Sequence, residues 1–395
     1  MRDWADEDVE SPGGSLRLSM VVMCHPRRAE SAGRLAAWLG RGTEQVFDPE
    51  PDAAPSALRT AARAWARCDG TSTHHAVVQD DIEPTANLWP LMESAIRTHP
   101  STVLTFYANS TSWNGASARA AVLTGHTWVP PVPGEYFPTL ATVMPCPLAH
   151  DFAELAAAHL SRQETDDDEV LADFLADRGV PALLRCPNLV EHRDMPSLSG
   201  WDADPRRPDM FGGVRRSVCF QPRTHTPSVE SVLASPPAWA QFNQRRALLR
   251  MPSLLGRTRW QTQSRAAQLK VLGISGARLQ RLSDAWFEQL PSLPERRGAV
   301  RLLIRELYLA GYGLGWVVAG VRPGAPEPPG HSPANDAALS TLMESGLAKD
   351  AAVLRWREHW DALTEIVWAA FREGYRADGA GARTERDVSV EASTR

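Results

Sequence analysis

The chain has 395 residues, of which 43% are hydrophobic and 23% are charged, and it carries a net charge of −5. Such a length and composition are typical of a globular protein with two domains, or with one domain and an appendage. The five cysteines are far apart in the sequence and include no Cys-x-x-Cys pair, which argues against a disulfide framework and against a structural zinc site.

Two segments, the amino-terminal end and the longest apolar run, indicate where in the cell the protein is expected. Residues 1–15 are acidic and lack the basic-then-apolar order of a secretory signal, so they predict a flexible leader. The apolar run over 307–321 is shorter than the roughly 18–20 residues that a membrane span needs, and it is interrupted by glycines. We therefore expect a buried helix there, no transmembrane segment and a cytoplasmic protein.

From residue 16 onward, short β-rich apolar runs alternate with segments in which apolar residues recur at spacings of three and four, as in helices. This alternation predicts an α/β domain over 16–220, with a mostly parallel sheet flanked by helices. The predicted strands are Leu18–Cys24, Glu44–Phe47, His75–Gln79, Thr102–Tyr107, Thr139–Met144 and Ala182–Arg185.

The remainder of the chain predicts an α-helical region. From about 236 to 320 the residue pattern is helical, without convincing strands. Residues 1–219 carry a net charge of −11, whereas 220–331 carry +9, so 221–321 are expected to form a basic helical region without strands. The glycines at 311, 313 and 315 do not form a dinucleotide fingerprint, because no predicted strand precedes them. A Pro/Gly linker over 322–334, a helical pair over 335–377 and a disordered tail over 378–395 are expected to follow.

An acidic pair, Asp80 and Asp81, follows directly after the strand predicted at His75–Gln79. Ligands of open α/β sheets bind at the carboxyl ends of the strands, so the pair is placed where a ligand is expected. Carboxylate oxygens suit Mg²⁺ or Mn²⁺, and such an ion would neutralise a diphosphate. The alternative is a solvated turn after the strand.

A second acidic run, Thr165–Glu169, opens a predicted helix, and His192 ends a short extended stretch after the last predicted strand. Carboxylates in a first helical turn are stabilised by the helix dipole, which is a structural explanation for the run. The functional interpretation is a general base for an acceptor hydroxyl. His192 is a candidate metal ligand, although a lone histidine is more often structural.

The order of these motifs resembles that of the GT-A glycosyltransferases, in particular bacterial and phage-type enzymes with a Glu-Asp-Asp variant of the Asp-x-Asp motif. The resemblance covers about residues 16–200. It is carried by His25-Pro26-Arg27-Arg28 after the first strand, Asp48 after the second, the acidic pair, the acidic run that opens a helix, and the final histidine.

The resemblance implies roles for these acidic residues. Asp81 would hold Mn²⁺ or Mg²⁺ with help from Asp80, and His192 would complete the metal site. Asp168 would be the catalytic base that deprotonates the acceptor, with Asp167 at the acidic position beside it.

Four further residues would bind the nucleotide. Asp48 would contact the nucleobase or the ribose, and Arg27, Arg28 and Arg63 are candidates for the nucleotide and its phosphates, because guanidinium groups suit anionic oxygens. Gln79 replaces an acidic residue of the family's triplet, which lowers the negative charge available to a metal.

The expected function is therefore a metal-dependent, inverting glycosyltransferase that moves a sugar from a nucleoside-diphosphate sugar to a hydroxyl acceptor. The basic helical region suggests an anionic acceptor, such as a nucleic acid, a glycan or a lipid-linked sugar; alternatively, its arginines only solvate a scaffold. Two other functions stay open. One is a sugar-phosphate nucleotidyltransferase, and the other is a non-catalytic protein that binds an anionic ligand or nucleic acid on a degenerate GT-A scaffold.

Overall fold

A computed structural model describes residues 15–162, 164–193, 195, 198, 216–222, 230–234, 236–253, 256–290, 297–322, 324–347 and 359–392. The leader expected at 1–15 lies outside these residues, except for residue 15.

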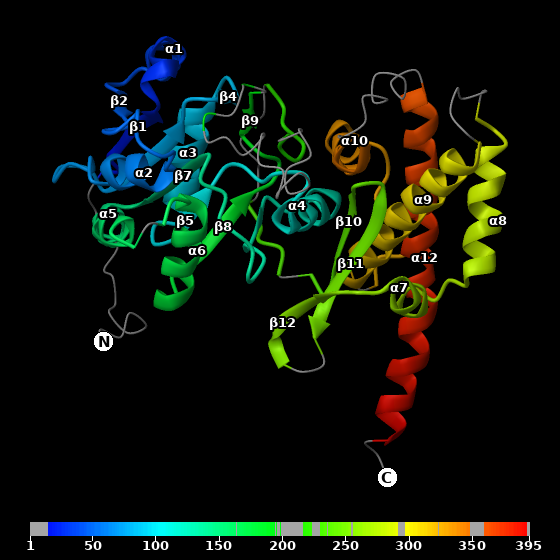
Figure 1. Cartoon of the computed structure of the whole chain (residues 1–395). Helices are drawn as coiled ribbons and strands as arrows, with labels where there is room; N and C mark the ends of the chain where they lie inside the picture. The colour runs from blue at the N-terminus through cyan, green and yellow to red at the C-terminus, as the bar shows by residue number, and fades with distance from the viewer. Residues whose placement is uncertain are drawn as a thin grey trace.

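The central sheet has seven strands in the order β2-β1-β3-β7-β5-β8-β6 (Figure 1). Five of them run in the same direction, while β7 and the edge strand β6 run in the opposite one. The strands are β1 (Leu18–Cys24), β2 (Glu44–Phe47), β3 (His74–Gln79), β5 (Val103–Thr105), β6 (Trp128–Val129), β7 (Ala141–Pro145) and β8 (Ala182–Arg185). The predicted α/β class with a mostly parallel sheet is confirmed, and β1, β2 and β8 have the predicted bounds.

Helices cover both faces of this sheet because its strands are apolar on both sides. Successive residues of β1 point to opposite faces: Val22 packs in a core with α1 and α3, and Val21 packs in a second core with α2, α5 and α6. The helices are α1 (Ala29–Leu39), α2 (Ala57–Trp65), α3 (Leu88–Thr98), α4 (Trp113–Leu123), α5 (Cys146–Leu160) and α6 (Asp167–Arg178). A separate two-stranded sheet joins β4 (Ile82–Pro84) to β9 (Val190–His192).

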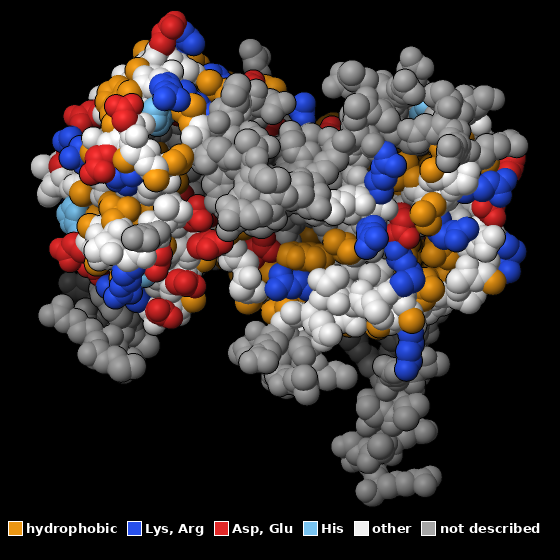
Figure 2. Space-filling view, in the orientation of Figure 1, with side chains coloured by type: hydrophobic (Ala, Val, Ile, Leu, Met, Phe, Trp, Pro, Cys, Tyr) orange, Lys and Arg blue, Asp and Glu red, His pale blue; other side chains and the backbone are white. Residues whose placement is uncertain are grey.

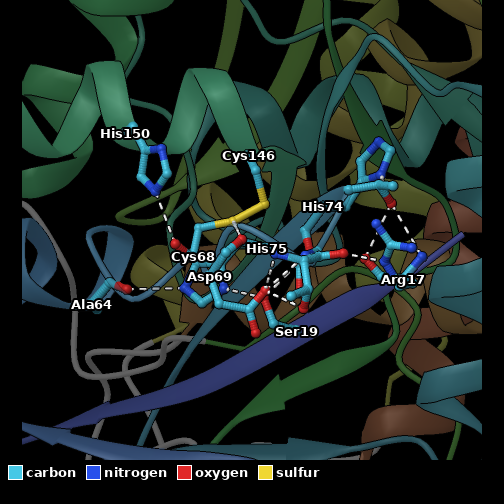
Figure 3. The surroundings of a disulfide bond; sticks show 12 residues. Arg17, Ser19, Ala64, Cys68, Asp69, His74, His75, Cys146 and His150 are labelled. Carbon is cyan, nitrogen blue, oxygen red and sulfur yellow. Dashed lines mark hydrogen bonds between the residues drawn. A yellow bond between two sulfur atoms is a disulfide. The ribbon is translucent and has the colours of Figure 1, made fainter.

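The structure contains one disulfide, although the spacing of the cysteines argues against a disulfide framework. Cys68 is bonded to Cys146, with a Cα–Cα distance of 5.9 Å, which is usual for a disulfide. Strand pairing explains the contact, because Pro145 at the end of β7 lies opposite His74 at the start of β3, close to Cys68. Figure 3 shows the bond between these segments, with the His150 ring directed at the Cys68 carbonyl oxygen, 2.9 Å away.

The C-terminal region is largely helical, as predicted, but the expectation that it contains no strands is wrong. β10 (Trp239–Asn243), β11 (Arg246–Ser253) and β12 (Gly256–Thr262) form an antiparallel sheet. The two residues that connect β10 to β11, Gln244 and Arg245, both have positive φ. A turn of this kind usually contains glycine or asparagine, so the hairpin lacks its ordinary sequence signal.

The helices of this region follow the sheet, and the longest apolar one and the next along the chain pack on it. They are α7 (Arg265–Val271), α8 (Gly276–Phe287), α9 (Arg297–Gly320), α10 (Pro333–Leu347) and α12 (Trp360–Ala392). The helical pair expected over 335–377 corresponds to α10 and α12. α12 continues to Ala392, so the helix extends past residue 378, where the sequence predicts a disordered tail.

The apolar run and its glycines are explained by the packing of α9 on α12. Segment Gly298–Gly320 is long and apolar enough to cross a membrane, but 78% of its most apolar window is buried inside the structure. A Cβ at Gly315 would collide with the backbone of Phe371, and one at Gly374 would collide with the backbone of Tyr312. The expected buried helix is confirmed, and its glycines allow a close helix–helix approach.

α4 joins the two halves of the molecule (Figure 1). Its apolar residues from Ala118 to Leu123 belong to the same core as β10, α9, α10 and α12. Arg119 of α4 is fully buried and donates hydrogen bonds to Gln241 of β10 (2.9 Å) and to Ser345 of α10 (2.9 Å). The α/β domain and the C-terminal region therefore share one interior.

Candidate functional site

A polar cavity of about 390 Å³ opens at the carboxyl ends of β1, β2 and β3. We call it the strand-end cavity. Five of the predicted site residues line it, namely Arg27, Arg28, Asp48, Asp80 and Asp81. Because β7 runs against β3, the segment before β7 also reaches this edge of the sheet, as does the start of α6, which precedes the parallel strand β8.

The acidic pair is buried and is bridged by an arginine. Asp80 is 5% exposed and Asp81 is 7% exposed. Nη1 of Arg28, at the end of the short 3-10 helix Pro26–Arg28, lies 2.9 Å from Oδ1 of Asp80 and 2.9 Å from Oδ2 of Asp81. Burial and the adjacent charge of Asp81 raise the pKa of Asp80, although Arg28 acts against both effects. One guanidinium thus partly neutralises two neighbouring carboxylates.

Some features of the pair fit a cation and others do not. Oδ1 of Asp81 is buried without a hydrogen-bond partner, which leaves a free carboxylate oxygen. The pairing of β9 with β4 places His192 opposite Ile82, and Nε2 of His192 lies 3.5 Å from Oδ2 of Asp81. However, in the described part of the chain no group of three or more His, Cys, Asp or Glu side chains is arranged to hold a metal ion. A divalent ion would require Arg28 to move.

Asp48 is held by an arginine that the sequence analysis did not single out. Its carboxylate accepts hydrogen bonds from Nε (2.7 Å) and Nη2 (2.8 Å) of Arg59, and Oδ1 also accepts one from the backbone N–H of Glu50 (3.1 Å). Burial acts to raise the pKa of Asp48, but these hydrogen bonds lower it overall. Arg59 also donates to the carbonyl of Ala54, so the pair fixes the loop that forms one wall of the strand-end cavity.

The arginine expected on the second helix is therefore displaced by one turn. Arg63 is exposed and does not line the strand-end cavity, whereas Arg59, four residues earlier, faces Asp48. Residues four positions apart lie on the same face of a helix, so the sequence pattern does not indicate which of the two arginines contacts Asp48.

The carboxylates at the start of α6 are partly shielded from solvent. Asp167 is 6% exposed, and Asp168 is half-buried. Burial raises the pKa of both carboxyl groups. The charges of Asp167 and Asp166 raise that of Asp168 further, whereas a hydrogen bond with the Thr139 hydroxyl limits the rise at Asp167.

Thr139 connects the two acidic sites. Its Oγ1 accepts a hydrogen bond from Nε2 of Gln79 (3.2 Å), which lines the strand-end cavity, and its hydroxyl also bonds to Asp167. The carbonyl of Thr165 accepts a hydrogen bond from the N–H of Leu58 at the start of α2 (2.9 Å). Asp167 and Asp168 do not line the cavity themselves, but they lie at the same edge of the sheet. Thr139 connects Asp167 by hydrogen bonds to Gln79, which does line the cavity.

No protein-family model matches the chain, and no similar sequence was found among curated proteins. Its function is therefore inferred from the arrangement of its residues.

Proposed function

We propose that the chain is a metal-dependent glycosyltransferase with a catalytic domain of the GT-A type, and that it moves a sugar from a nucleoside-diphosphate sugar to a hydroxyl acceptor. The observation that carries this proposal is the placement of two carboxylate sites at one edge of the sheet. Asp80 and Asp81 lie in a polar cavity, and Asp167 and Asp168 lie beside it.

The strand-end cavity suits the nucleotide part of the donor. A volume of about 390 Å³ falls within the range of small-molecule sites, which is roughly 300–1,000 Å³. Arg27 and Arg28 supply guanidinium groups, which bind phosphate oxygens in two-pronged fashion. Asp48 is occupied by Arg59, so its contribution is to hold the cavity wall rather than to bind a nucleobase or ribose directly.

Asp81, with its unpartnered Oδ1, would hold Mg²⁺ or Mn²⁺ together with Asp80 and His192. Bound there, the ion would neutralise charge on the leaving diphosphate. Arg28 would then exchange its carboxylate partners for a phosphate. The charge of the acidic pair would be offset in both states, partly by the single guanidinium in the first and by the divalent ion in the second.

Asp168 is the better candidate for the catalytic base. A general base is most effective when its pKa lies near the working pH, and burial moves the pKa of Asp168 upward in that direction. Asp167 is more deeply buried and is engaged by Thr139, so it is placed to hold the start of α6. A carboxylate that activates the acceptor favours inversion at the anomeric carbon.

Binding measurements test this assignment. Calorimetric titration of the protein with UDP and GDP, each with Mn²⁺, Mg²⁺ or EDTA, should show nucleotide binding that requires the metal and is lost in Asp81→Asn. Asp173→Asn is the matched control, because Asp173 is an exposed carboxylate on α6. Metal-dependent binding that survives Asp81→Asn unchanged would remove the acidic pair from the site.

A further inference from the structure

A cluster of three tryptophans and one ion pair lies where the α/β domain meets the C-terminal sheet. We call it the tryptophan cluster; it consists of Trp113, Glu135, Trp239, Arg250 and Trp260. The Glu135 carboxylate accepts a hydrogen bond from the backbone N–H of Trp113, the first residue of α4. The carboxylate lies 3.7 Å from Nη1 of Arg250 on β11, and the Arg250 guanidinium lies over the Trp113 ring, 5.5 Å from its centroid.

The aromatic members pack together around one buried indole. The ring centroids of Trp239 and Trp260 are 3.7 Å apart, and Trp113 and Trp260 are only partly buried. Trp239 is 1% exposed, and its indole N–H has no hydrogen-bond partner. A buried N–H is usually paired, so this unpaired donor is an unusual feature of the cluster.

The ion pair retains hydrogen-bonding capacity. A distance of 3.7 Å between Glu135 and Arg250 exceeds the roughly 2.7–2.9 Å of a charge-assisted hydrogen bond. Both side chains are largely shielded, at 13% and 16% exposure. Burial raises the pKa of Glu135 to about 7, despite the opposing charge of Arg250, so this carboxyl group can both donate and accept near neutral pH.

The tryptophan cluster lies beside the proposed catalytic carboxylates. The loop that carries Glu135 continues to Phe137, whose N–H donates to the carbonyl of Asp168 (3.1 Å), and to Thr139, which bonds to Asp167. Figure 2 shows acidic, hydrophobic and basic side chains next to one another on the face between α6 and β11. A group bound at the cluster would therefore be near the base.

We propose that the tryptophan cluster binds a neutral sugar residue of the acceptor, an inference that rests on the proposed glycosyltransferase function. A sugar ring presents an apolar face to an aromatic side chain and hydroxyls to charged groups, and sites of this composition bind such ligands. The partly exposed Trp113 and Trp260 would contact the ring. Glu135 and Arg250 would bind hydroxyls, and they are two polar groups that fix orientation.

The charge distribution opposes a strongly anionic acceptor. Three arginines of the basic helical region are paired with carboxylates, with Arg250 facing Glu135, Arg265 facing Glu306 and Arg278 facing Glu373. Their field is therefore reduced by neighbouring charges. The acidic run that opens α6 would also repel a phosphate or a carboxylate at the tryptophan cluster.

The test measures sugar binding directly and needs no turnover. Saturation-transfer NMR is recorded for the full chain with methyl glycosides of glucose, galactose, mannose and N-acetylglucosamine, and with methyl glucuronide as the anionic probe. At least one neutral glycoside should bind. Trp113→Ala and Arg250→Gln should weaken its affinity about tenfold or more, which corresponds to about 1.4 kcal/mol. Trp38→Ala is the matched control, because Trp38 is 52% exposed on α1.

Circular dichroism identifies any variant that fails to fold. Such a variant is replaced in the comparison by Glu135→Gln, which keeps the shape of the side chain. The inference is overturned if no neutral glycoside binds, if only the glucuronide binds, or if folded variants of the tryptophan cluster bind like the wild type. Failure of the proposed function gives a different result, namely no nucleotide or donor binding at the strand-end cavity.

Discussion

Replacing Arg28 with glutamine tests whether the acidic pair is built to hold a cation. In the wild type, one guanidinium nitrogen lies 2.9 Å from both carboxylates, and both are almost fully buried. Removing one partner of a buried ion pair costs about 3–5 kcal/mol, because the remaining charge stays desolvated. For a domain of about 150–250 residues, about 3 kcal/mol corresponds to a fall in Tm of roughly 6–12 °C.

The effect of a metal ion on the stability of Arg28→Gln shows whether the acidic pair binds a cation. In EDTA, Arg28→Gln should unfold at a lower temperature than the wild type. Mn²⁺ should restore more stability to the variant than to the wild type, because the ion no longer competes with a guanidinium; at a concentration of 100 times Kd the gain is about 2.7 kcal/mol. Scanning calorimetry at pH 7.5 with EDTA or MnCl₂ measures both effects.

The same variant has a defined pH response. Asp80 already has a raised pKa, and loss of Arg28 should raise it further, so the native state binds this proton more readily than the unfolded chain does. Stability then decreases as pH rises through the native pKa, and the deficit of the variant should shrink as pH falls from 8 toward 5. A cation site at the acidic pair is contradicted if the variant melts like the wild type in EDTA, or if Mn²⁺ stabilises neither protein.

Three further predictions concern the base, the disulfide and the shared interior. Asp168→Asn should lower turnover by about 10²–10⁴-fold while nucleotide binding is kept. In the wild type, turnover should increase with pH at values above those at which carboxyl groups usually ionise, because burial and the charges of Asp167 and Asp166 raise the pKa of the base. If Asp167→Asn instead causes the loss of turnover, the two residues exchange roles. Cys68→Ser should lower the free energy of unfolding by about 2–4 kcal/mol, and dithiothreitol should have no further effect on the stability of that variant. The bond would be contradicted if an alkylating reagent labelled both Cys68 and Cys146 in the wild-type protein without prior reduction. A chain ending at residue 235 should aggregate and bind a hydrophobic dye, because it leaves Arg119 and the apolar residues of α4 uncovered; cooperative unfolding of a soluble truncated monomer would contradict this.

The strands of the central sheet other than the two-residue β6 were predictable, because each is a local apolar run in the sequence. Runs such as Leu18–Cys24 are apolar on both faces, bounded by polar segments, and alternate with helical patterns. The positions of Asp80 and Asp81 followed from the end of one such run. The hairpin of β10 and β11 was not predictable in this way, because Gln244 and Arg245 make its turn without glycine.

Contacts between residues far apart in the chain could not be predicted from the sequence pattern. Cys68 and Cys146 are 78 residues apart, and only the antiparallel pairing of β3 with β7 brings them together. The bridging position of Arg28 likewise depends on how the 3-10 helix after β1 meets the end of β3. Glu135 belongs to no motif, and its interest comes from burial and from Arg250 on a strand that the sequence did not indicate.

The most direct test of the central claim is product analysis with nucleotide-sugar donors. Full-length protein is incubated with UDP- and GDP-linked hexoses in Mn²⁺, Mg²⁺ or EDTA, with Asp81→Asn, Asp168→Asn and the control Asp173→Asn run in parallel. We expect metal-dependent release of free nucleoside diphosphate from at least one donor, retained in Asp173→Asn and lost in Asp81→Asn. No nucleoside diphosphate from any donor with either metal would contradict the proposed glycosyl transfer, and so would release of pyrophosphate in a parallel incubation with a nucleoside triphosphate and a sugar phosphate.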